Sequence, residues 1–284
     1  MRRLEQGDVL IEQRDALEAM REFRDQSFDL AIADPPYGAA SKHVWSLPAD
    51  HDLPGFGGAW NLATHEWDLM GGAESFRFTL AWLSELRRLV KPTGSIWIHG
   101  TYHNAGITNV ACQILNIEII NEVIWFKRNA FPNLAKRRLT ASHESLLWVH
   151  TGGSSRRVYR FNYDDVKAAA FPYDGLKEPG KQMRTVWDIP NNKGREERAF
   201  GSHPTQKPLR LIERMLLVSG TPSGRVLIPF LGSGTDAIAA LRWGMAPTGF
   251  EVDEEFFRIA LRRLGEEMTF FGEALHQRSA AAER

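Results

Sequence analysis

A carboxylate, two prolines and a tyrosine follow directly after a short apolar run of the chain. The run is Phe28–Ala33, and the polar segment is Asp34, Pro35, Pro36 and Tyr37. Such a run is typical of a buried parallel strand, which proline ends because it has no N–H for the hydrogen-bond ladder. Ligands of open α/β sheets bind at the carboxyl ends of strands, so Asp34 and the Pro35 carbonyl could accept hydrogen bonds from an NH2 group. The Tyr37 ring offers a flat face for a planar partner, although a plain surface turn would also explain the motif.

A second segment with chemical potential is the turn that holds Gly232 and Gly234. It joins a predicted strand, 226–228, to a predicted helix that runs through Trp243. Glycines allow the backbone to approach a ligand closely, and a helix N-terminus offers free N–H groups. The next predicted strand ends in Glu251, an acid suited to ribose hydroxyls. Tight strand–helix packing and an ordinary helix cap are the structural alternatives for these residues.

The elements that must position these residues alternate between strands and helices. Apolar patterning predicts strands at 8–12, 28–33, 95–99, 117–126, 145–150, 226–228 and 248–251. Helical spacing is present after Asp15, at 76–89 and 104–115, from Leu209 to Leu216, and from 235 to 243. Asp15 would cap its helix, which is worth ~1 kcal/mol. The alternation predicts an α/β fold with a mostly parallel sheet.

Composition sets the class of protein. The 284 residues are 43% hydrophobic and hold 35 basic and 35 acidic residues, so the chain can bury a core as one large α/β domain or two small ones. The single cysteine, Cys112, excludes an intramolecular disulfide and a zinc site of several cysteines. No signal peptide and no long apolar span is visible, which predicts a cytoplasmic enzyme without a membrane partner.

Three segments fall outside this alternation. Residues 38–72 lack periodicity but contain three tryptophans, so we expect a partly ordered flap over the site. Residues 125–160 hold eight basic residues and one acid, Glu144, and much of the excess lies in the loop 127–142. A local basic surface of this kind is enough for nucleic-acid binding at zero net charge. Residues 152–200 have few apolar runs and many charges, which favours an irregular insertion at the surface.

The motifs and their order resemble the amino-group DNA methyltransferases of the β type, which use S-adenosylmethionine. In that family Asp-Pro-Pro-Tyr comes first, a target-recognition region follows, and Phe-x-Gly-x-Gly lies near the C-terminus, as at residues 34–37 and 230–234 here. Further matches lie at 15–17, 66–68, 91–95, 203–208 and 249–251. The resemblance implies a Rossmann-like methyltransferase fold, with helices on both faces of a mostly parallel sheet and an inserted target-recognition region.

The resemblance also divides the chain. Residues 1–151 would form the catalytic half, with the flap 38–72 and the basic loop 127–142. Residues 152–200 would be the inserted target-recognition region. Residues 201–276 would form the cofactor-binding half of the same domain, and 277–284 a tail.

Carried over residue by residue, the resemblance implies roles for individual side chains. Glu251 would bind the cofactor ribose, Asp15 would lie near its adenine, and Thr205 and Lys207 would lie near its carboxylate. The cofactor set is Asp15, Ala16, Asp34, Thr205, Lys207, Phe230, Gly232, Ser233, Gly234, Thr235 and Glu251. The catalytic set is Asp34, Pro35, Pro36 and Tyr37, the DNA-binding set is Lys127, Arg128, Lys136, Arg137 and Arg138, and no metal is expected.

One position departs from the family pattern. Ile228 stands where the family usually has an aspartate that helps to hold the ammonium group of the cofactor. That ammonium would then be bound by Asp34, a backbone carbonyl or water. Weakened cofactor binding or a rearranged site would follow, and a catalytically silent DNA-binding paralogue is one alternative.

The implied reaction is methyl transfer to the N6 of adenine. The N6 lone pair is delocalised into the ring, and hydrogen bonds to Asp34 and the Pro35 carbonyl would favour a pyramidal, nucleophilic nitrogen. The methyl group would lie in line at ~3 to 3.5 Å, and the flipped base would stack on Tyr37. Sequence reading would fall to the basic loop and to 152–200, although the recognition sequence cannot be read from them.

Other substrates and partners remain open. Methylation of cytosine at N4 needs the same geometry, but the subfamily of cytosine-N4 methyltransferases usually has serine at the position of Asp34. RNA and protein amide methyltransferases usually carry the two motifs in the reverse order. The expected partner is duplex DNA, within a restriction–modification system, and the resemblance allows a homodimer and a cognate restriction endonuclease.

Overall fold

The computed structural model describes residues 2–37, 72–130, 132, 137–152, 158–169, 171, 180–191, 197, 199–200 and 205–282, with side chains through 269. The predicted flap, except Gly72, lies outside the described residues. Among the described helices, none is both long and apolar enough to cross a membrane.

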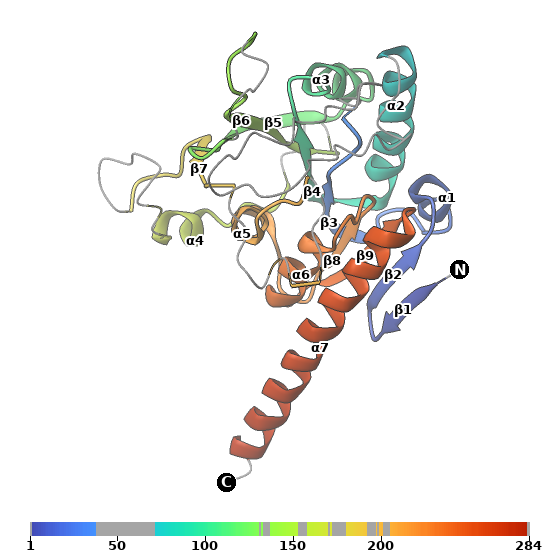
Figure 1. Ribbon diagram of the computed structural model, residues 1–284, viewed down its shortest axis with the longest axis vertical. Helices are drawn as coiled ribbons and strands as arrows, with labels where there is room; N and C mark the ends of the chain where they lie inside the picture. Colours follow the sequence, from blue (N-terminus) through green and yellow to red (C-terminus); the bar gives the residue numbers. More distant parts are fainter. Residues whose placement is uncertain are drawn as a thin grey trace, which may run out of the picture.

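A nine-stranded sheet forms the centre of the described structure (Figure 1). Its order is β1-β2-β9-β8-β3-β4-β6-β5-β7. The strands are β1 (Arg3–Gln6), β2 (Val9–Gln13), β3 (Phe28–Ala33), β4 (Val90–Gly100), β5 (Glu118–Phe126), β6 (His143–His150), β7 (Val186–Asp188), β8 (Arg225–Ile228) and β9 (Ala246–Glu251). The run β2-β9-β8-β3-β4 is parallel throughout, whereas β1 and β6 pair antiparallel with their neighbours. The mostly parallel α/β sheet predicted from the sequence is therefore confirmed.

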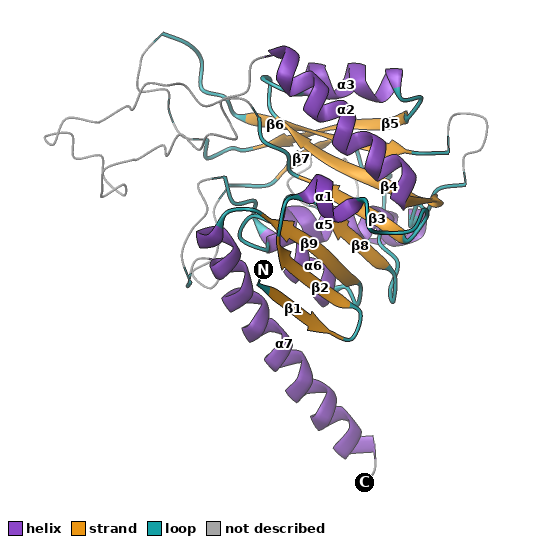
Figure 2. Ribbon diagram, turned by 90° about the vertical axis from the view of Figure 1, so that its right-hand side faces the viewer, coloured by secondary structure: helices purple, strands orange, loops and turns teal. Residues whose placement is uncertain are grey.

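Helices cover both faces of this sheet (Figure 2). On one face lie α1 (Ala16–Met20), α2 (Gly72–Leu89) and α3 (Ala105–Ile114). On the other lie α4 (Tyr163–Ala168), α5 (Leu209–Ser219), α6 (Thr235–Arg242) and the long α7 (Glu254–Ala282). Two hydrophobic cores result, one between the sheet and each helical layer.

Strand β3 shows why an apolar run is needed at the centre of the sheet. Leu30 and Ile32 pack into the core beneath α5 and α6, whereas Ala31 and Ala33 pack into the core beneath α2. All four side chains are completely buried. Burial of each large aliphatic side chain stabilises the fold by ~1.5 to 3 kcal/mol, and it fixes the point at which Asp34 leaves the sheet.

Two segments differ from the sequence-based expectation. Within 152–200, strand β7 joins the sheet beside β5, and Val166, Trp187 and Ile189 enter the core, although composition favoured a surface role. A three-residue strand around one tryptophan has no periodicity to detect. Helix α7 continues to Ala282, through most of the segment 277–284 predicted as a tail, and Figure 1 shows it projecting away from the sheet.

Candidate active site

A cavity of about 260 Å³ opens at the carboxyl ends of β2, β3, β8 and β9. All four strands are parallel, so the segments that follow them meet at one edge of the sheet. Of the predicted cofactor and catalytic residues, those that line it are Asp15, Ala16, Asp34, Pro35, Pro36, Tyr37, Thr205, Lys207, Phe230, Gly232, Ser233, Thr235 and Glu251. The fold thus gathers residues from both ends of the chain into one site.

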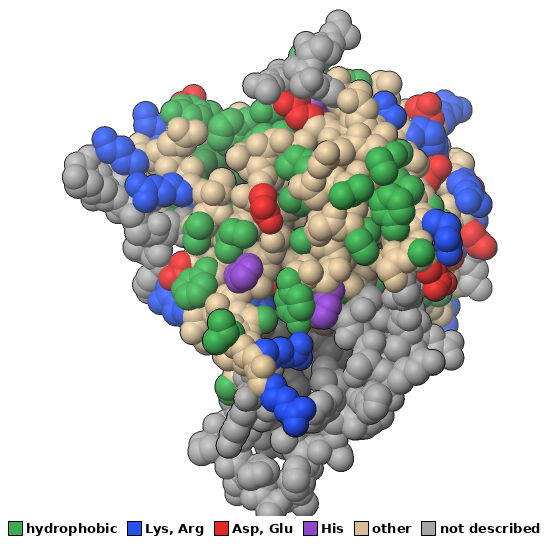
Figure 3. All heavy atoms as spheres, turned by 90° about the horizontal axis from the view of Figure 1, so that it is seen from above, with side chains coloured by type: hydrophobic (Ala, Val, Ile, Leu, Met, Phe, Trp, Pro, Cys, Tyr) green, Lys and Arg blue, Asp and Glu red, His purple; other side chains and the backbone are tan. Residues whose placement is uncertain are grey.

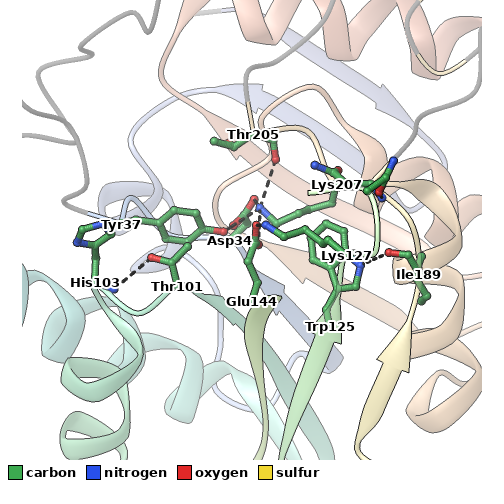
Figure 4. A network of polar contacts seen from close by, with 12 residues as sticks. Asp34, Tyr37, Thr101, His103, Trp125, Lys127, Glu144, Ile189, Thr205 and Lys207 are labelled. Carbon is green, nitrogen blue, oxygen red and sulfur yellow. Dashed lines mark hydrogen bonds and ion pairs between the residues drawn. The ribbon is translucent and has the colours of Figure 1, made fainter. Parts of the chain in front are cut away.

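Asp34 is the centre of a polar network in this cavity (Figure 4). The Tyr37 hydroxyl donates a hydrogen bond to Asp34 Oδ1. Lys207 Nζ lies 2.8 Å from Asp34 Oδ2 and 2.8 Å from the Tyr37 hydroxyl oxygen. It also donates to the Thr205 carbonyl at 3.3 Å. The carboxylate is therefore fixed from both sides, and each of its oxygens keeps capacity for a further donor.

Burial and charge act in opposite directions on this network. Burial alone would raise the pKa of Asp34, but the Lys207 ammonium and its hydrogen bond outweigh it and leave that pKa below the usual value. Burial alone would lower the pKa of Lys207, but the charges of Asp34 and Glu144 raise it overall. Burial and the Asp34 charge raise the pKa of Tyr37 well above its usual range. At neutral pH the pair is charged and the phenol is neutral.

Three titratable residues near Asp34 were not expected from the sequence. His99 lies near the end of β4, the strand next to β3, and is fully buried, with no hydrogen-bond partner for either ring nitrogen among the described residues. Burial lowers its pKa to about 4, so the ring is neutral. Glu144 is the second residue of β6, and its Oε2 lies 3.8 Å from Lys207 Nζ. Asp236 lines the cavity from α6. The adjacency of the strands, which the sequence does not give, identifies His99 and Glu144, whereas Asp236 follows the predicted glycine turn by two positions.

The glycine turn after β8 combines a binding surface with tight packing. Glu251 Oε2 accepts the Gly232 N–H at 2.8 Å, and Oε1 accepts the Asp253 N–H at 2.8 Å. Burial raises the pKa of Glu251. Gly234 does not line the cavity: its φ is +82°, and an added Cβ would lie 3.1 Å from the Ala260 Cβ. The packing alternative therefore explains Gly234, whereas Gly232 faces the cavity.

Buried Arg263 of α7 holds the outer side of the same turn. Its Nη1 donates to the Ser233 carbonyl at 2.7 Å, to Ser233 Oγ at 3.0 Å and to Thr235 Oγ1 at 3.0 Å. Asp15 also has a structural role, because it accepts the Glu18 N–H at 3.0 Å as the N-cap of α1. Asp15, Ser233 and Thr235 line the cavity, and their hydrogen bonds stabilise its wall at the same time.

Ile228, the departure from the family pattern, is fully buried. It belongs to the core between the sheet and α5, α6 and α7, and it is not among the cavity residues. The structure therefore places an apolar side chain in an apolar environment at this position.

The predicted DNA-binding residues are not equivalent. Lys127 pairs with Glu144 at 2.9 Å and is 13% exposed, and Arg128 pairs with Asp188 at 2.8 Å. Arg137 and Arg138 are exposed, and Arg138 Nη1 donates to the Tyr102 hydroxyl at 3.2 Å. Lys136 lies outside the described residues. In Figure 3, Lys and Arg side chains lie beside the hollowed part of the face shown.

The donor set fits S-adenosylmethionine, the cofactor that the resemblance implies. The cavity combines aromatic walls, Phe78, Phe230 and Phe250, with carboxylates at Glu251 and Asp236. Flat apolar rings suit adenine and the thioether chain, and carboxylates suit ribose hydroxyls and an ammonium group. Among the described residues no cluster of three or more His, Cys, Asp or Glu could hold a metal ion.

Comparisons with known proteins identify the family of the chain. The family model for N6/N4 DNA methylases matches residues 28–262. The chain is 31% identical over 257 residues to the Type II methyltransferase M2.DpnII of Streptococcus pneumoniae, with 90% of this chain and 89% of that protein covered.

Solved structures agree on the fold. The M1.HpyAVI complex with S-adenosylmethionine covers 89% of this chain and 98% of its own, with a TM-score of 0.61 and 22% identity. The cytosine-N4-specific PvuII DNA methyltransferase covers 89% and 85%, with a TM-score of 0.65 and 17% identity. The predicted methyltransferase fold is confirmed, and the chain belongs to the N6/N4 family of DNA methylases.

Proposed function

We propose that this S-adenosylmethionine-dependent DNA methyltransferase acts on the exocyclic N6 of a flipped adenine at a specific site in duplex DNA. The observation that carries the proposal is the half-buried, ionised carboxylate of Asp34, held by Lys207 and Tyr37 at the edge of the cavity. In the resembling family, aspartate at this position is usual for adenine and serine for cytosine.

The chemistry that Asp34 performs is hydrogen-bond acceptance. Its low pKa keeps the carboxylate ionised at neutral pH, and a carboxylate has about four acceptor sites for the donors that reach it. An NH2 group can therefore be bound while Lys207 and Tyr37 stay in place. The next acceptor is the Pro35 carbonyl. Neither Pro35 nor Pro36 has a backbone N–H that could compete for it. Two acceptors on one amine draw its hydrogens away from the ring plane and direct its lone pair outward.

The rest of the reaction is positioning. Bound S-adenosylmethionine supplies an electrophilic methyl group on its sulfonium sulfur. Tyr37 holds the target ring beside Asp34, and the turn after β8 forms the opposite wall of the cavity. Orientation of two reactants at ~3 to 3.5 Å removes most of the entropic barrier of a bimolecular step. Buried His99 stays neutral, so it adds no positive charge that would repel the sulfonium.

We propose that duplex DNA is bound through exposed basic side chains. Arg137 and Arg138 satisfy this condition, whereas Lys127 and Arg128 already pair with acids. A base must leave the duplex to enter a cavity of this kind. Sequence reading is assigned to residues 127–142 and 152–200, and a restriction–modification context is supported by the Type II relatives. A homodimer and a cognate endonuclease stay predictions.

The deciding experiment is nucleoside analysis of DNA incubated with the protein and isotopically labelled S-adenosylmethionine. Label in N6-methyladenine, at one sequence context, is the expected result. Label in N4-methylcytosine would assign the enzyme to the other substrate of its family. No label, with cofactor still bound in calorimetry, would identify a silent DNA-binding paralogue.

A further inference from the structure

The cofactor has an ammonium group, and the aspartate that usually holds it in the family is replaced by buried Ile228. We propose that Asp236, on the first turn of α6, binds the ammonium of S-adenosylmethionine in its place. This inference depends on S-adenosylmethionine as cofactor but not on adenine as the target.

The other three acids that line the cavity each accept hydrogen bonds from the protein. Asp15 caps α1 through the Glu18 N–H. Asp34 accepts from Tyr37 and Lys207. Glu251 accepts two backbone N–H groups, from Gly232 and Asp253.

Asp236 differs from all three. It lines the cavity and is only 6% exposed. Among the described residues it makes no hydrogen bond and no ion pair, although buried carboxylates are normally satisfied. A buried acceptor that faces a cavity and has no protein partner is suited to a donor from the ligand.

The charges that face Asp236 come from three other elements. Asp34 follows β3, Lys207 precedes α5, and Arg263 belongs to α7. Lys207 is bound to Asp34, and Arg263 is hydrogen-bonded to the turn at Ser233 and Thr235. Burial and the repulsion from Asp34 raise the pKa of Asp236 to about 7, and the two cations only partly oppose this. The site therefore favours one additional positive charge.

The substitution at Ile228 fits the same assignment. Ile228 belongs to the same hydrophobic core as Ile11 and the buried residues of α6, and it does not line the cavity. A carboxylate at 228 would need a partner there, whereas Asp236 already presents one to the ligand. In this assignment the negative charge lies at the start of α6 instead of at the end of β8, eight positions further along the chain.

The test uses calorimetric titration of the full chain with S-adenosylhomocysteine, which keeps the ammonium and does not react. The amino group of the ligand has a pKa near 7.7 to 8.0, so titrations stay at or below pH 7.5. If Asp236 must ionise, affinity for the protonated ligand increases roughly five- to sixfold from pH 6.0 to 7.5, after allowance for the ligand's own titration. Titrations at pH 7 in buffers of different ionisation enthalpy should show a net release of about 0.3 to 0.4 proton.

Variants separate this carboxylate from the rest of the cavity. Asp236→Asn should weaken S-adenosylhomocysteine roughly 10- to 100-fold at pH 7.5 and remove the pH dependence. Binding of 5′-methylthioadenosine, which lacks the amino-acid part, should change less than twofold, and this binding also shows that the variant is folded. Glu213→Gln is the matched control, because burial also raises the pKa of Glu213 but it lies outside the cavity.

Equal losses of affinity for both ligands in Asp236→Asn would overturn the proposal, as would a wild-type affinity independent of pH with no proton released. Neither result would affect the nucleoside analysis, which tests the target base separately. Conversely, methylation of cytosine would leave the assignment of Asp236 unchanged.

Discussion

Lys207 Nζ lies 2.8 Å from Asp34 Oδ2, although 173 positions separate the two residues in the chain. The ion pair joins the end of β3 to the segment before α5 and is largely shielded from solvent. A shielded pair with a shared tyrosine hydroxyl has a fixed geometry, and the loss of either partner leaves an uncompensated charge. The acceptor that we assign to the target amine is thus held by the segment that precedes α5.

Asp34→Asn should lower kcat at least 100-fold and change DNA affinity little, because the carboxylate acts most strongly on the transition state. Steady-state kinetics with saturating cofactor measure this effect. Asp25→Asn is the matched control: Asp25 is exposed and pairs with Arg88 at the surface, away from the cavity. Turnover by Asp34→Asn close to that of the control would contradict the assignment of Asp34.

Lys207→Met should move the acid limb of the kcat–pH profile to higher pH. Lys207 keeps the pKa of Asp34 low against burial, so its removal leaves burial to raise that pKa, and activity is then lost as the pH falls through the new value. Lys207→Arg should restore the position of the limb. A profile of Lys207→Met that falls equally at every pH would indicate a purely structural role.

Neutralising Arg137 and Arg138 should weaken DNA binding on all sequences. The slope of log K against log salt concentration should become shallower by ~0.9 for each phosphate contact that is lost. Fluorescence titrations at several salt concentrations give the slope. Arg128→Ala is the comparison, because Arg128 already pairs with Asp188 and should leave the slope nearly unchanged. An unchanged slope in the double variant would show that these arginines belong to a solvated loop that does not contact phosphates.

Ile228→Asp should destabilise the fold by about 3 kcal/mol or more, because it buries an unpaired carboxylate in an apolar core. Ile228→Val, which removes one methyl group, should cost only ~0.5 to 1.5 kcal/mol. Urea unfolding of both variants measures the difference. Tighter cofactor binding by Ile228→Asp at an unchanged melting temperature would show that position 228 reaches the ligand after all.

Asp236→Asn should melt at a higher temperature than the wild type in the absence of cofactor at pH 8. The folded-state pKa of Asp236, about 7, lies above the unfolded value of ~3.9, so ionisation penalises the folded state increasingly as the pH rises from 4 to 7. The advantage of the variant should therefore be full above pH 7 and vanish near pH 4. Differential scanning calorimetry across this range checks it, and a constant difference would point to a cause other than titration.

Most of the sheet and the cavity could be predicted from the sequence, because they follow from local signals. The apolar run before Asp34, the glycine turn and the position of Glu251 each have a pattern of their own, and the structure brings all three to one cavity. Gly234 was assigned to the ligand, yet it packs against Ala260. A glycine pattern cannot distinguish close approach to a ligand from close approach to a helix.

The residues that could not be predicted depend on contacts between distant segments. His99 and Glu144 become part of the site only because β4 lies between β3 and β6. Trp187 enters the core only because three residues pair with β5. The pairing of Lys127 and Arg128 with acids is likewise a property of the fold and not of the basic loop itself.

Strand β2, near the start of the chain, pairs with β9, the last strand along the chain. Arg2 also forms an ion pair with Glu254 at 2.7 Å. The cavity requires that the carboxyl ends of these strands be adjacent, but not that they follow one another in any particular order along the polypeptide. A circular permutant that starts before α5, and joins a shortened α7 to β1 through a flexible linker, would keep the same neighbours for every strand of the sheet. It would then carry the glycine turn ahead of Asp34 and still assemble the same active site.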